Sequence, residues 1–404
     1  MKILHSIPYF APAWDYGGPV RSCYNLAKQL ARKGHDVTVF TTDSLDGNKR
    51  LKQLHEILDD VTIKRFRNIS NTLSYRYNIS TPIGLTGCPK DFGDYDIVHM
   101  HEYRTLQNIL VRRHAKRHNI PYILQARGGL TTFFYKGALK KTFDRLWGYR
   151  ILRDAAKVIA LTKIEVGQYQ EMGLPDDKIV VLPNGIDLAE FEHLPPKGQF
   201  REKYNIDNST KIILYLGRLH QIKGIDLLVK AFCKLREDFK NVRLVITGPD
   251  DGFLGTLEEM VRELAIEEKV LFTGPLHGEA RLAAYVDTEV YVLPSFYEIF
   301  GITVLEAMAC GTPVIVTDRC GLAEEVDKQA GLVVPYDEKI LSQALAEILG
   351  DELMRLEFGT KGRALVREKF NWEKITERVE QIYEQVLNEQ KNIKPDNSAD
   401  CPKY

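Results

Sequence analysis

Short apolar runs alternate with helical segments along this chain, and this alternation limits the possible folds more than any other feature. Lys2–Ile7 is predicted to be a strand, Pro19–Lys33 an amphipathic helix, and Asp36–Thr41 a second strand. Pro19 suits the first turn of a helix, and Gly34 is a typical helix end. Strands joined through a helix pair in parallel, whereas a tight hairpin joins antiparallel neighbours. The N-terminal segment therefore predicts an α/β fold with a parallel sheet.

The same alternation continues in both halves of the chain. Two such series predict two doubly wound α/β domains. The length of 404 residues and the hydrophobic content of 44% agree with two cores rather than one. The further predicted strands are residues 96–100, 122–125, 158–161 and 179–182, and then 211–216, 243–247, 270–272, 290–293 and 313–317.

A cluster of Pro195, Pro196 and Gly198 marks the predicted domain boundary, within residues 185–203. We assign residues 1–190 to the N-terminal domain and residues 191–370 to the C-terminal domain. Residues 371–388 then hold a last amphipathic helix, and the polar residues 389–404 predict a disordered tail. The apolar side of that helix consists of Ile375, Val379, Ile382, Tyr383 and Val386.

Cysteine usage and the N-terminal segment indicate the compartment. The six cysteines are scattered, without CxxC or metal-ligand spacing, so we expect reduced thiols. The N-terminal apolar run is too short for a signal peptide, and Pro8 interrupts it. No run approaches the roughly 18–20 apolar residues of a membrane span. We therefore expect a cytoplasmic protein.

Charge is distributed unevenly although the chain is neutral overall. Residues 1–190 hold 28 Lys and Arg against 19 Asp and Glu, and segment 104–157 holds 13 against two. This excess predicts an anionic ligand or an anionic membrane surface, which would place the protein on the inner face of the membrane. A solvated basic helix face is the alternative. Aromatic residues between the basic ones suit lipid, but core contacts explain them equally well, and no nucleic-acid-binding motif accompanies them.

The segment from Ser295 to Val316, SFYEIFGITVLEAMACGTPVIV, carries two carboxylates in an apolar setting. Glu298 lies in the loop after a predicted strand, where α/β sheets bind ligands. A helix is predicted from Ile302 to Cys310 and ends at Gly311, which places Glu306 about one turn inside it. The glycine before this helix would let backbone N–H groups approach an anion. Phosphate-binding amides beside two carboxylates suit a diphosphate and sugar hydroxyls.

This segment resembles the donor site of retaining family-4 glycosyltransferases with the GT-B fold, which have the pattern E-x7-E followed by A-M-A-x-G-x-P-V. The resemblance covers residues 1 to about 387. It implies two Rossmann-like domains facing a cleft and a C-terminal helix that crosses back to the first domain. Further matching pieces are Gly17-Gly18, the turn 184–187 (NGID), Gly217-Arg218-Leu219 with Lys223-Gly224, Gly248-Pro249-Asp250, and Gly274 with Leu276.

Roles on the donor side follow from this resemblance and from the residue types. Arg218 and Lys223 would neutralise the diphosphate and the charge that develops on the leaving group. The alternative is two surface cations at a turn. Glu298 is the third residue assigned to catalysis, since with nearby amides it would address the donor hexose. By resemblance the other donor-binding residues are Gly17, Gly18, Pro249, Leu276, Phe300, Gly301, Ile302 and Glu306, the last on the ribose.

On the acceptor side, His101 and Glu102 end a first-domain strand, and a structural role for either remains open. Many relatives carry a His after the next strand, whereas this chain has Arg127 there, similar to members with a P-R-G loop. A guanidinium binds an anion better than it accepts a proton. We therefore expect Arg127 to contact an anionic part of the acceptor or donor.

The resemblance predicts a metal-independent, retaining hexosyltransferase without a cofactor. Asp250 and Asp251 are adjacent, so they lack the Asp-x-Asp spacing that holds a nucleotide-sugar cation. The donor would be a UDP- or GDP-linked hexose, and the acceptor a hydroxyl on a glycan or lipid-linked sugar. One alternative is a nucleotide-sugar 2-epimerase of the same architecture, which needs no acceptor. Another is a non-catalytic sugar-nucleotide-binding subunit.

Overall fold

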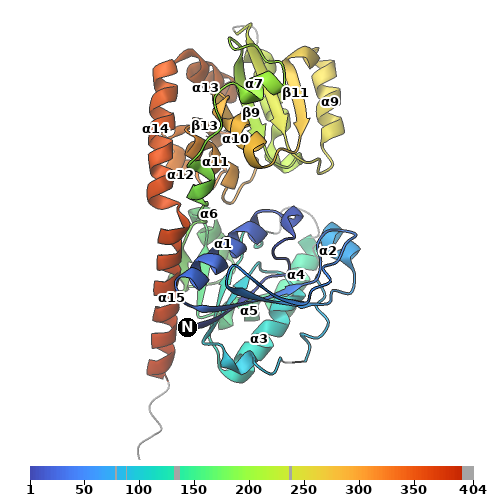
Figure 1. The fold of residues 1–404 in the computed structure, drawn as a ribbon, viewed down its shortest axis with the longest axis vertical. Helices are drawn as coiled ribbons and strands as arrows, with labels where there is room; N and C mark the ends of the chain where they lie inside the picture. The colour runs from blue at the N-terminus through green and yellow to red at the C-terminus, as the bar shows by residue number, and fades with distance from the viewer. Residues whose placement is uncertain (78–79, 88, 132–136, 236–238, 394–404) are drawn as a thin grey trace, which may run out of the picture. The chain divides into compact units, whose positions relative to one another are not determined.

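The computed structural model describes residues 1–77, 80–87, 89–131, 137–235 and 239–393. The chain forms two compact units (Figure 1). Unit 1 is Met1–Asn184 with the segment that begins at Trp372, and unit 2 is Gly185–Asn371. The division after Asn184 thus precedes the boundary that we assigned between residues 190 and 191.

Unit 1 contains an eight-stranded sheet in the order β3-β4-β2-β1-β5-β6-β7-β8. All neighbours pair in parallel except β3 and β4, which are antiparallel. The six predicted strands are confirmed. The sequence analysis missed β3 and β4, although Val61 and Ile63 alternate with polar residues in β4. The strands are β1 Lys2–Ser6, β2 Asp36–Thr42, β3 His55–Leu58, β4 Val61–Phe66, β5 Ile97–His101, β6 Tyr122–Gln125, β7 Lys157–Ala160 and β8 Ile179–Val181.

Helices cover both faces of this sheet. One face packs on α1 and on α15, which run beside each other (Figure 1). The apolar side of α15 lies in one core with Ile3, Val39 and Ile97, so the predicted return of the C-terminal helix to the first domain is confirmed. The helices are α1 Gly18–Arg32, α2 Asn71–Tyr77, α3 Leu106–His118, α4 Gly137–Phe143, a π-helical turn Asp144–Gly148, α5 Tyr149–Asp154, α6 Lys163–Glu171 and α15 Trp372–Ile393.

The helix α15 extends further than expected. It reaches Ile393, so the predicted tail is wrong for residues 389–393. Residues 394–404 lie outside the described part of the chain. Glu-, Lys- and Gln-rich sequence at 388–393 has a good helix propensity, and an existing helix extends at little cost because nucleation has already occurred.

Unit 2 contains a six-stranded, wholly parallel sheet in the order β11-β10-β9-β12-β13-β14. All five predicted strands are present, and β14 was missed. The strands are β9 Lys211–Leu216, β10 Val242–Thr247, β11 Val270–Gly274, β12 Val290–Leu293, β13 Val314–Thr317 and β14 Gly331–Val334. The helices are α7 Gln199–Lys203, α8 Ile225–Leu235, α9 Leu254–Glu263, α10 Gly278–Val286, α11 Ile302–Cys310, α12 Ala323–Val326, α13 Glu338–Gly350 and α14 Glu352–Lys369.

The first strand of each unit lies inside its sheet, and the strand order reverses beside it. In unit 1 the reversal falls between β1 and β5, and in unit 2 between β9 and β12. The loops after two such strands leave in opposite directions, so a crevice forms at their carboxyl ends. This topology predicts that ligands bind at the loops after β1 and β5 in unit 1 and after β9 and β12 in unit 2.

Candidate active site

The loops after β9 and β12 in unit 2 bring a cation and a carboxylate together. Nζ of Lys223 lies 2.5 Å from Oε2 of Glu298, and the two side chains are 16% and 17% exposed. Two residues far apart in sequence therefore meet at the strand reversal, in a partly dry position where their charges act strongly. Arg218 lies in the same loop as Lys223 but is exposed, and it pairs with Asp251 at 2.6 Å.

Gly224 makes the close approach of these two loops possible. It follows a short 3-10 turn, Gln221–Lys223, and its φ of +64° is unfavourable for other residues. A Cβ atom at this position would lie 2.1 Å from the backbone oxygen of Pro294, at the start of the loop that carries Glu298. The glycine of the K-G pair is thus required for contact between the loops.

Helix α11 begins directly after the Glu298 loop. Its bounds and its end at Gly311 agree with the prediction. Gly301 caps the helix with a φ of +80°, so the first amide groups of α11 have no side-chain cap. Such amides, with the helix dipole, favour an anion. The side chain of Phe300 is buried and packs edge-on against Phe370, so only the backbone of Phe300 is available to a donor.

Glu306 is held by two residues of α10 that the sequence analysis did not single out. Nη1 of Arg281 lies 2.9 Å from Oε1 of Glu306, and the Tyr285 hydroxyl donates to Oε2 at 3.1 Å. Arg281 also reaches Glu190 at 2.7 Å. Burial lowers the pKa of Arg281, but Glu306, Tyr285 and Glu190 outweigh it, so the pKa is raised. Glu306 is therefore an oriented carboxylate, and a carboxylate oxygen can accept hydrogen bonds from hydroxyl groups.

Two further donor residues that we predicted follow neighbouring strands. Pro249 lies after β10, and Leu276 lies after β11. Because all strands of this sheet are parallel, both loops open on the same edge as Lys223 and Glu298. The carboxyl edge of unit 2 therefore holds the predicted donor residues of that unit, in strand order.

In unit 1, Gly17 and Gly18 lie where the loop after β1 enters α1. Gly17 caps the helix with a φ of +89°, and Gly18 is its first residue. A Cβ atom at either glycine would meet nothing within 4 Å, so their lack of a side chain leaves the backbone open. Their contact with a donor stays a prediction.

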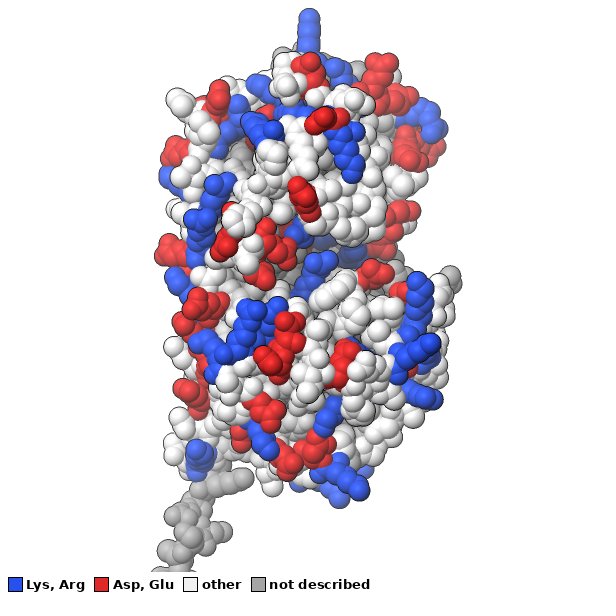
Figure 2. Space-filling model, viewed as in Figure 1, with Lys and Arg blue, Asp and Glu red and all other residues white. Residues whose placement is uncertain are grey.

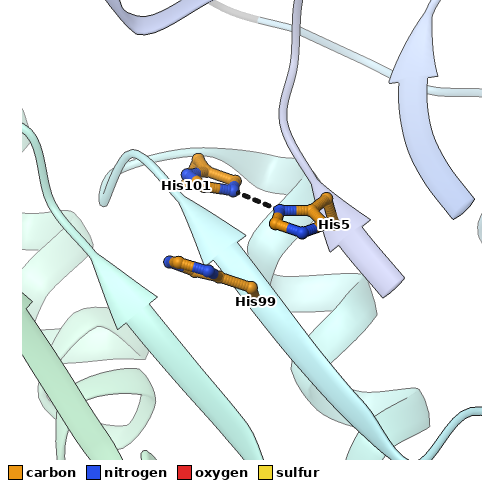
Figure 3. Close-up of side chains that lie close together, drawn as sticks. All are labelled: His5, His99 and His101. Carbon is orange, nitrogen blue, oxygen red and sulfur yellow. Dashed lines mark hydrogen bonds between the residues drawn. The ribbon is translucent and has the colours of Figure 1, made fainter. Parts of the chain in front are cut away.

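Three buried histidines lie side by side at the β1–β5 reversal (Figure 3). His5 is on β1, and His99 and His101 are on β5, with the rings of the latter two stacked at 4.2 Å. Nε2 of His101 lies 2.8 Å from Nδ1 of His5. Nδ1 of His101 lies 3.2–3.3 Å from Nη2 and Nε of Arg127. Arginine only donates, so Nδ1 of His101 accepts, and its Nε2–H donates to His5.

These histidines form a hydrogen-bonded network rather than a set of metal ligands. Their ring nitrogens lie within 4.8 Å of one another, which by itself could attract a cation. However, both nitrogens of His101 are already hydrogen-bonded, and the half-buried Arg127 guanidinium would repel a second cation. Nδ1 of His99 is likewise hydrogen-bonded to the Tyr383 hydroxyl of α15 at 2.7 Å.

The protonation of this network makes the free energy of unfolding depend on pH. Burial first, and then Arg127, lowers the pKa of His5 to about 3, and burial lowers the pKa of His99 and His101 as well. The unfolded chain titrates near 6.5, so it binds more protons than the folded state below that pH. The free energy of unfolding therefore falls as the pH drops from about 6.5, by about 1.4 kcal/mol per pH unit for each such group.

A His5→Asn variant isolates one of these groups, because the asparagine Oδ1 can still accept the hydrogen of His101. We expect the plot of unfolding free energy against pH to be less steep than in the wild type by about 1.4 kcal/mol per unit between about pH 6 and 4. Urea unfolding across that range measures it. The raised pKa values of Glu102 and Glu165 make the free energy of unfolding rise as the pH falls, which is opposite to the effect of the histidines. This contribution is the same in both proteins and therefore cancels when their slopes are compared. Equal slopes would mean that His5 is charged in the folded state.

The predicted acceptor residues differ in how accessible they are. His101 is fully buried and uses both ring nitrogens. Arg127 donates to His101 and, at 2.9 Å, to Oδ1 of Asn184, which leaves one N–H on each terminal nitrogen. Burial raises the pKa of Glu102 to about 7, partly offset by Arg127, and its Oε2 is buried without a hydrogen bond to any described residue. Of the three, Glu102 is best placed to exchange a proton.

Two α/β units, each with a largely parallel sheet whose strand order reverses beside its first strand, form the architecture of the GT-B class. Residues 16–190 match the family described as Glycosyltransferase Family 4, and residues 196–365 match Glycosyl transferases group 1. The chain belongs to the family-4 glycosyltransferases, and it is a glycosyltransferase. The predicted fold class, family and type of activity are therefore confirmed.

Individual relatives agree with this assignment along nearly the whole chain. An uncharacterized glycosyltransferase of Methanocaldococcus jannaschii, MJ1607, is 29% identical over 390 residues, which are 92% of this chain and 96% of the relative. A D-inositol 3-phosphate glycosyltransferase of Corynebacterium jeikeium is 28% identical, with 96% of each chain covered. The structure of Anabaena Alr3699/HepE in complex with UDP and glucose has a TM-score of 0.76, 18% identity, and coverage of 95% and 100%.

Proposed function

We propose that this glycosyltransferase moves a hexose from a UDP- or GDP-linked donor to a hydroxyl of a glycan or lipid-linked acceptor, with retention of anomeric configuration and without a metal. The observation that carries the proposal is the Lys223–Glu298 contact at the β9–β12 reversal, directly before the N-terminus of α11. A cation, the first amides of a helix and a carboxylate meet there, as a sugar diphosphate requires.

The proposed reaction assigns one task to each of these groups. The bond between the anomeric carbon and the phosphate oxygen breaks while the acceptor oxygen bonds to the same carbon on the same face. The acceptor proton passes to the departing phosphate, so no enzyme nucleophile is needed. Lys223, with Arg218, stabilises the negative charge on that phosphate, and Glu298 orients hexose hydroxyls. Glu306 binds the ribose.

Nucleotide binding tests the donor assignment before any acceptor is known. In a thermal-shift panel of UDP, GDP and ADP hexoses, we expect one nucleotide to raise the melting temperature, because a ligand that binds the folded state stabilises it. In Glu306→Gln the affinity for that nucleotide should fall by about 10–100-fold through weaker ribose hydrogen bonds.

A matched control is Glu289→Gln. Glu289 also pairs with a buried arginine, Arg201 at 3.0 Å, but it precedes β12 and so lies at the amino edge of the sheet. The Glu289→Gln variant should lower the free energy of unfolding without changing the affinity for the nucleotide. Equal losses of affinity in both variants would contradict the role of Glu306.

The acceptor is proposed to carry an anionic group that Arg127 contacts. The compound in the name of the Corynebacterium jeikeium relative carries a phosphate. Arg127 retains one N–H on each terminal nitrogen for such a group. This assignment and that of His101 and Glu102 depend on the proposed reaction.

We also propose that the basic segment of unit 1 meets an anionic membrane surface. No helix in the described residues is long and apolar enough to cross a bilayer. Along the α4–α5 segment, apolar side chains are exposed between basic residues. Figure 2 shows that positive and negative charges are mixed on the face in view. Residues 132–136 of the basic segment 104–157 lie outside the described part of the chain. The exposed apolar residues are Leu139 at 68%, Tyr149 at 50%, Leu146 at 47% and Trp147 at 40%.

Liposome binding tests the membrane proposal. Replacing Lys141, Arg145 and Arg150 with serine should reduce co-sedimentation with anionic vesicles, because each basic residue near such a surface contributes roughly 1 kcal/mol. Serine at the exposed Arg32, Lys52 and Arg67 removes the same charge elsewhere in unit 1 and should change little. If the wild-type protein does not co-sediment with anionic vesicles at low salt, the membrane proposal is wrong. The proposed transferase activity does not depend on this result.

A further inference from the structure

Three side chains from neighbouring loops form a cluster at the carboxyl edge of unit 2. Phe296 follows β12, Arg319 follows β13 and Tyr336 follows β14, and these strands are adjacent in the sheet. The Arg319 guanidinium carbon lies 4.2 Å from the Phe296 ring centre and 5.0 Å from that of Tyr336. The two rings are perpendicular. Both rings therefore attract the guanidinium through cation–π contacts.

Arg319 differs from the other cations at this edge. Arg218, Lys223 and Arg281 each pair with a carboxylate. Within the described residues, no hydrogen bond or ion pair of the Arg319 side chain occurs, and even its neighbour Asp318 does not pair with it. Cation–π contacts use the positive charge of the guanidinium and leave its fork of N–H donors available. Such a fork matches the two oxygens of a carboxylate or phosphate.

The cluster is tied to the groups that the proposed reaction uses. The backbone N–H of Glu298 donates to the Arg319 oxygen at 3.2 Å, and that of Phe296 donates to the Ile222 oxygen at 2.9 Å, one residue before Lys223. Leu276 and Pro249 follow β11 and β10, on the opposite side of the β9–β12 reversal. The cluster thus flanks the Lys223–Glu298 pair on the side away from the predicted donor-binding residues Pro249 and Leu276.

Phe296 adds an apolar surface to this cation. Its side chain is 43% exposed, although it is a large aromatic residue in a loop that otherwise carries buried or paired groups. An exposed ring can pack against the C–H face of a sugar, while the guanidinium beside it selects an oxyanion on the same sugar.

We infer that Arg319, held by Phe296 and Tyr336, is a specificity site for a sugar that carries a carboxylate or phosphate, next to the transferred hexose. The inference rests on the proposed function, since Glu298 defines the hexose position. The anionic sugar is either the hexose of the donor or the terminal residue of the acceptor. Charge-assisted, two-pronged contact favours it over a neutral sugar by about 10–100-fold.

Two binding series distinguish these sources. The first compares UDP-glucuronate with UDP-glucose, and the GDP-linked pair if GDP is the preferred nucleotide. The second compares free glucuronate and glucose 6-phosphate with glucose, in the presence of the nucleoside diphosphate, by saturation-transfer NMR. We expect the wild type to prefer the anionic member at least about tenfold in one series, and the preference to weaken with salt.

Variants assign the preference to Arg319. Arg319→Met should abolish it, and Arg319→Lys, which keeps the charge without the fork, should retain part of it even if the methionine variant folds poorly. Arg262→Met removes an exposed cation of α9 and should leave the preference unchanged. No preference in either series, or its persistence in Arg319→Met, would overturn the inference. Binding of the nucleoside diphosphate is measured in the same samples. If the nucleotide binds but the preference is absent or unchanged in Arg319→Met, only this inference is wrong, whereas a protein that binds no nucleotide would contradict the proposed function.

Discussion

A Lys223→Met variant is expected to transfer hexose about 100–1,000-fold more slowly than the wild type, with a much smaller change in donor KM. Removing one preorganised charge that stabilises a departing oxyanion costs this much in comparable sites. The Lys223 ammonium is only 16% exposed and already fixed by Glu298, so it needs little reorganisation as the charge develops. Release of nucleoside diphosphate, measured at saturating donor, gives kcat directly.

Lys234→Met is the matched control for this variant. Lys234 also pairs with a glutamate of unit 2, Glu338 at 2.7 Å, but both side chains are more exposed and the pair joins α8 to α13. Its loss should leave kcat unchanged, since an exposed ion pair contributes little even to stability. A Lys223→Met enzyme with wild-type kcat would remove Lys223 from the reaction.

A Gly224→Ala variant is expected to lower the free energy of unfolding by about 2–4 kcal/mol. The left-handed backbone alone costs roughly 1–2 kcal/mol for a residue with a Cβ atom. That atom would also lie 2.1 Å from the Pro294 oxygen, so the loops after β9 and β12 must move apart. Nucleotide binding and turnover should therefore fall together with stability. Urea unfolding and the thermal-shift panel measure both effects.

Gly255→Ala provides the opposite case in the same unit. Gly255 is in α9, has no positive φ, and a Cβ atom there would meet nothing within 4 Å. Alanine should be neutral or stabilise the protein by up to about 1 kcal/mol, because it restricts the unfolded chain and favours the helix. If the two variants were equally stable, the role of Gly224 in joining the loops would be wrong.

The parts of the fold that the sequence predicts are those with local signals. The central strands of unit 2 are short apolar runs, because a parallel strand covered on both faces has no polar side. The bounds of α11 follow from two glycines, one at each end. The predicted apolar side of α15 is correct because a helix periodicity over two turns or more defines one face.

The parts that sequence reasoning missed depend on residues far apart in the chain. Strand β14 is an exception, because its Leu332, Val333 and Val334 favour a strand locally and the sequence analysis overlooked them. The contacts of Glu306 with Arg281 and Tyr285 join α11 to α10, and no spacing in the sequence indicates that α10 presents these residues to α11. Similarly, Arg319 lies in an ordinary polar loop, and only the folded structure places two rings around it.

At the strand reversal of unit 1, the sequence indicated the position of the predicted acceptor residues in the sheet but not their hydrogen bonds or protonation. The motif HMH at the end of β5 correctly marks the strand reversal of unit 1. It does not show that His5 joins the network from β1, or that Arg127 donates into it from beyond β6. Burial of the network explains why Glu102, with its raised pKa, is the better candidate for contact with an acceptor hydroxyl.

The most direct test of hexosyl transfer is proton NMR of the purified protein with each UDP- and GDP-linked hexose, in EDTA and with candidate glycan and lipid-linked acceptors. We expect one donor to be consumed, with release of the nucleoside diphosphate and a product whose anomeric proton has the donor's configuration, and we expect Lys223→Met to suppress both. Formation of a 2-epimeric nucleotide sugar without nucleotide release, or a product of inverted configuration, would contradict the account.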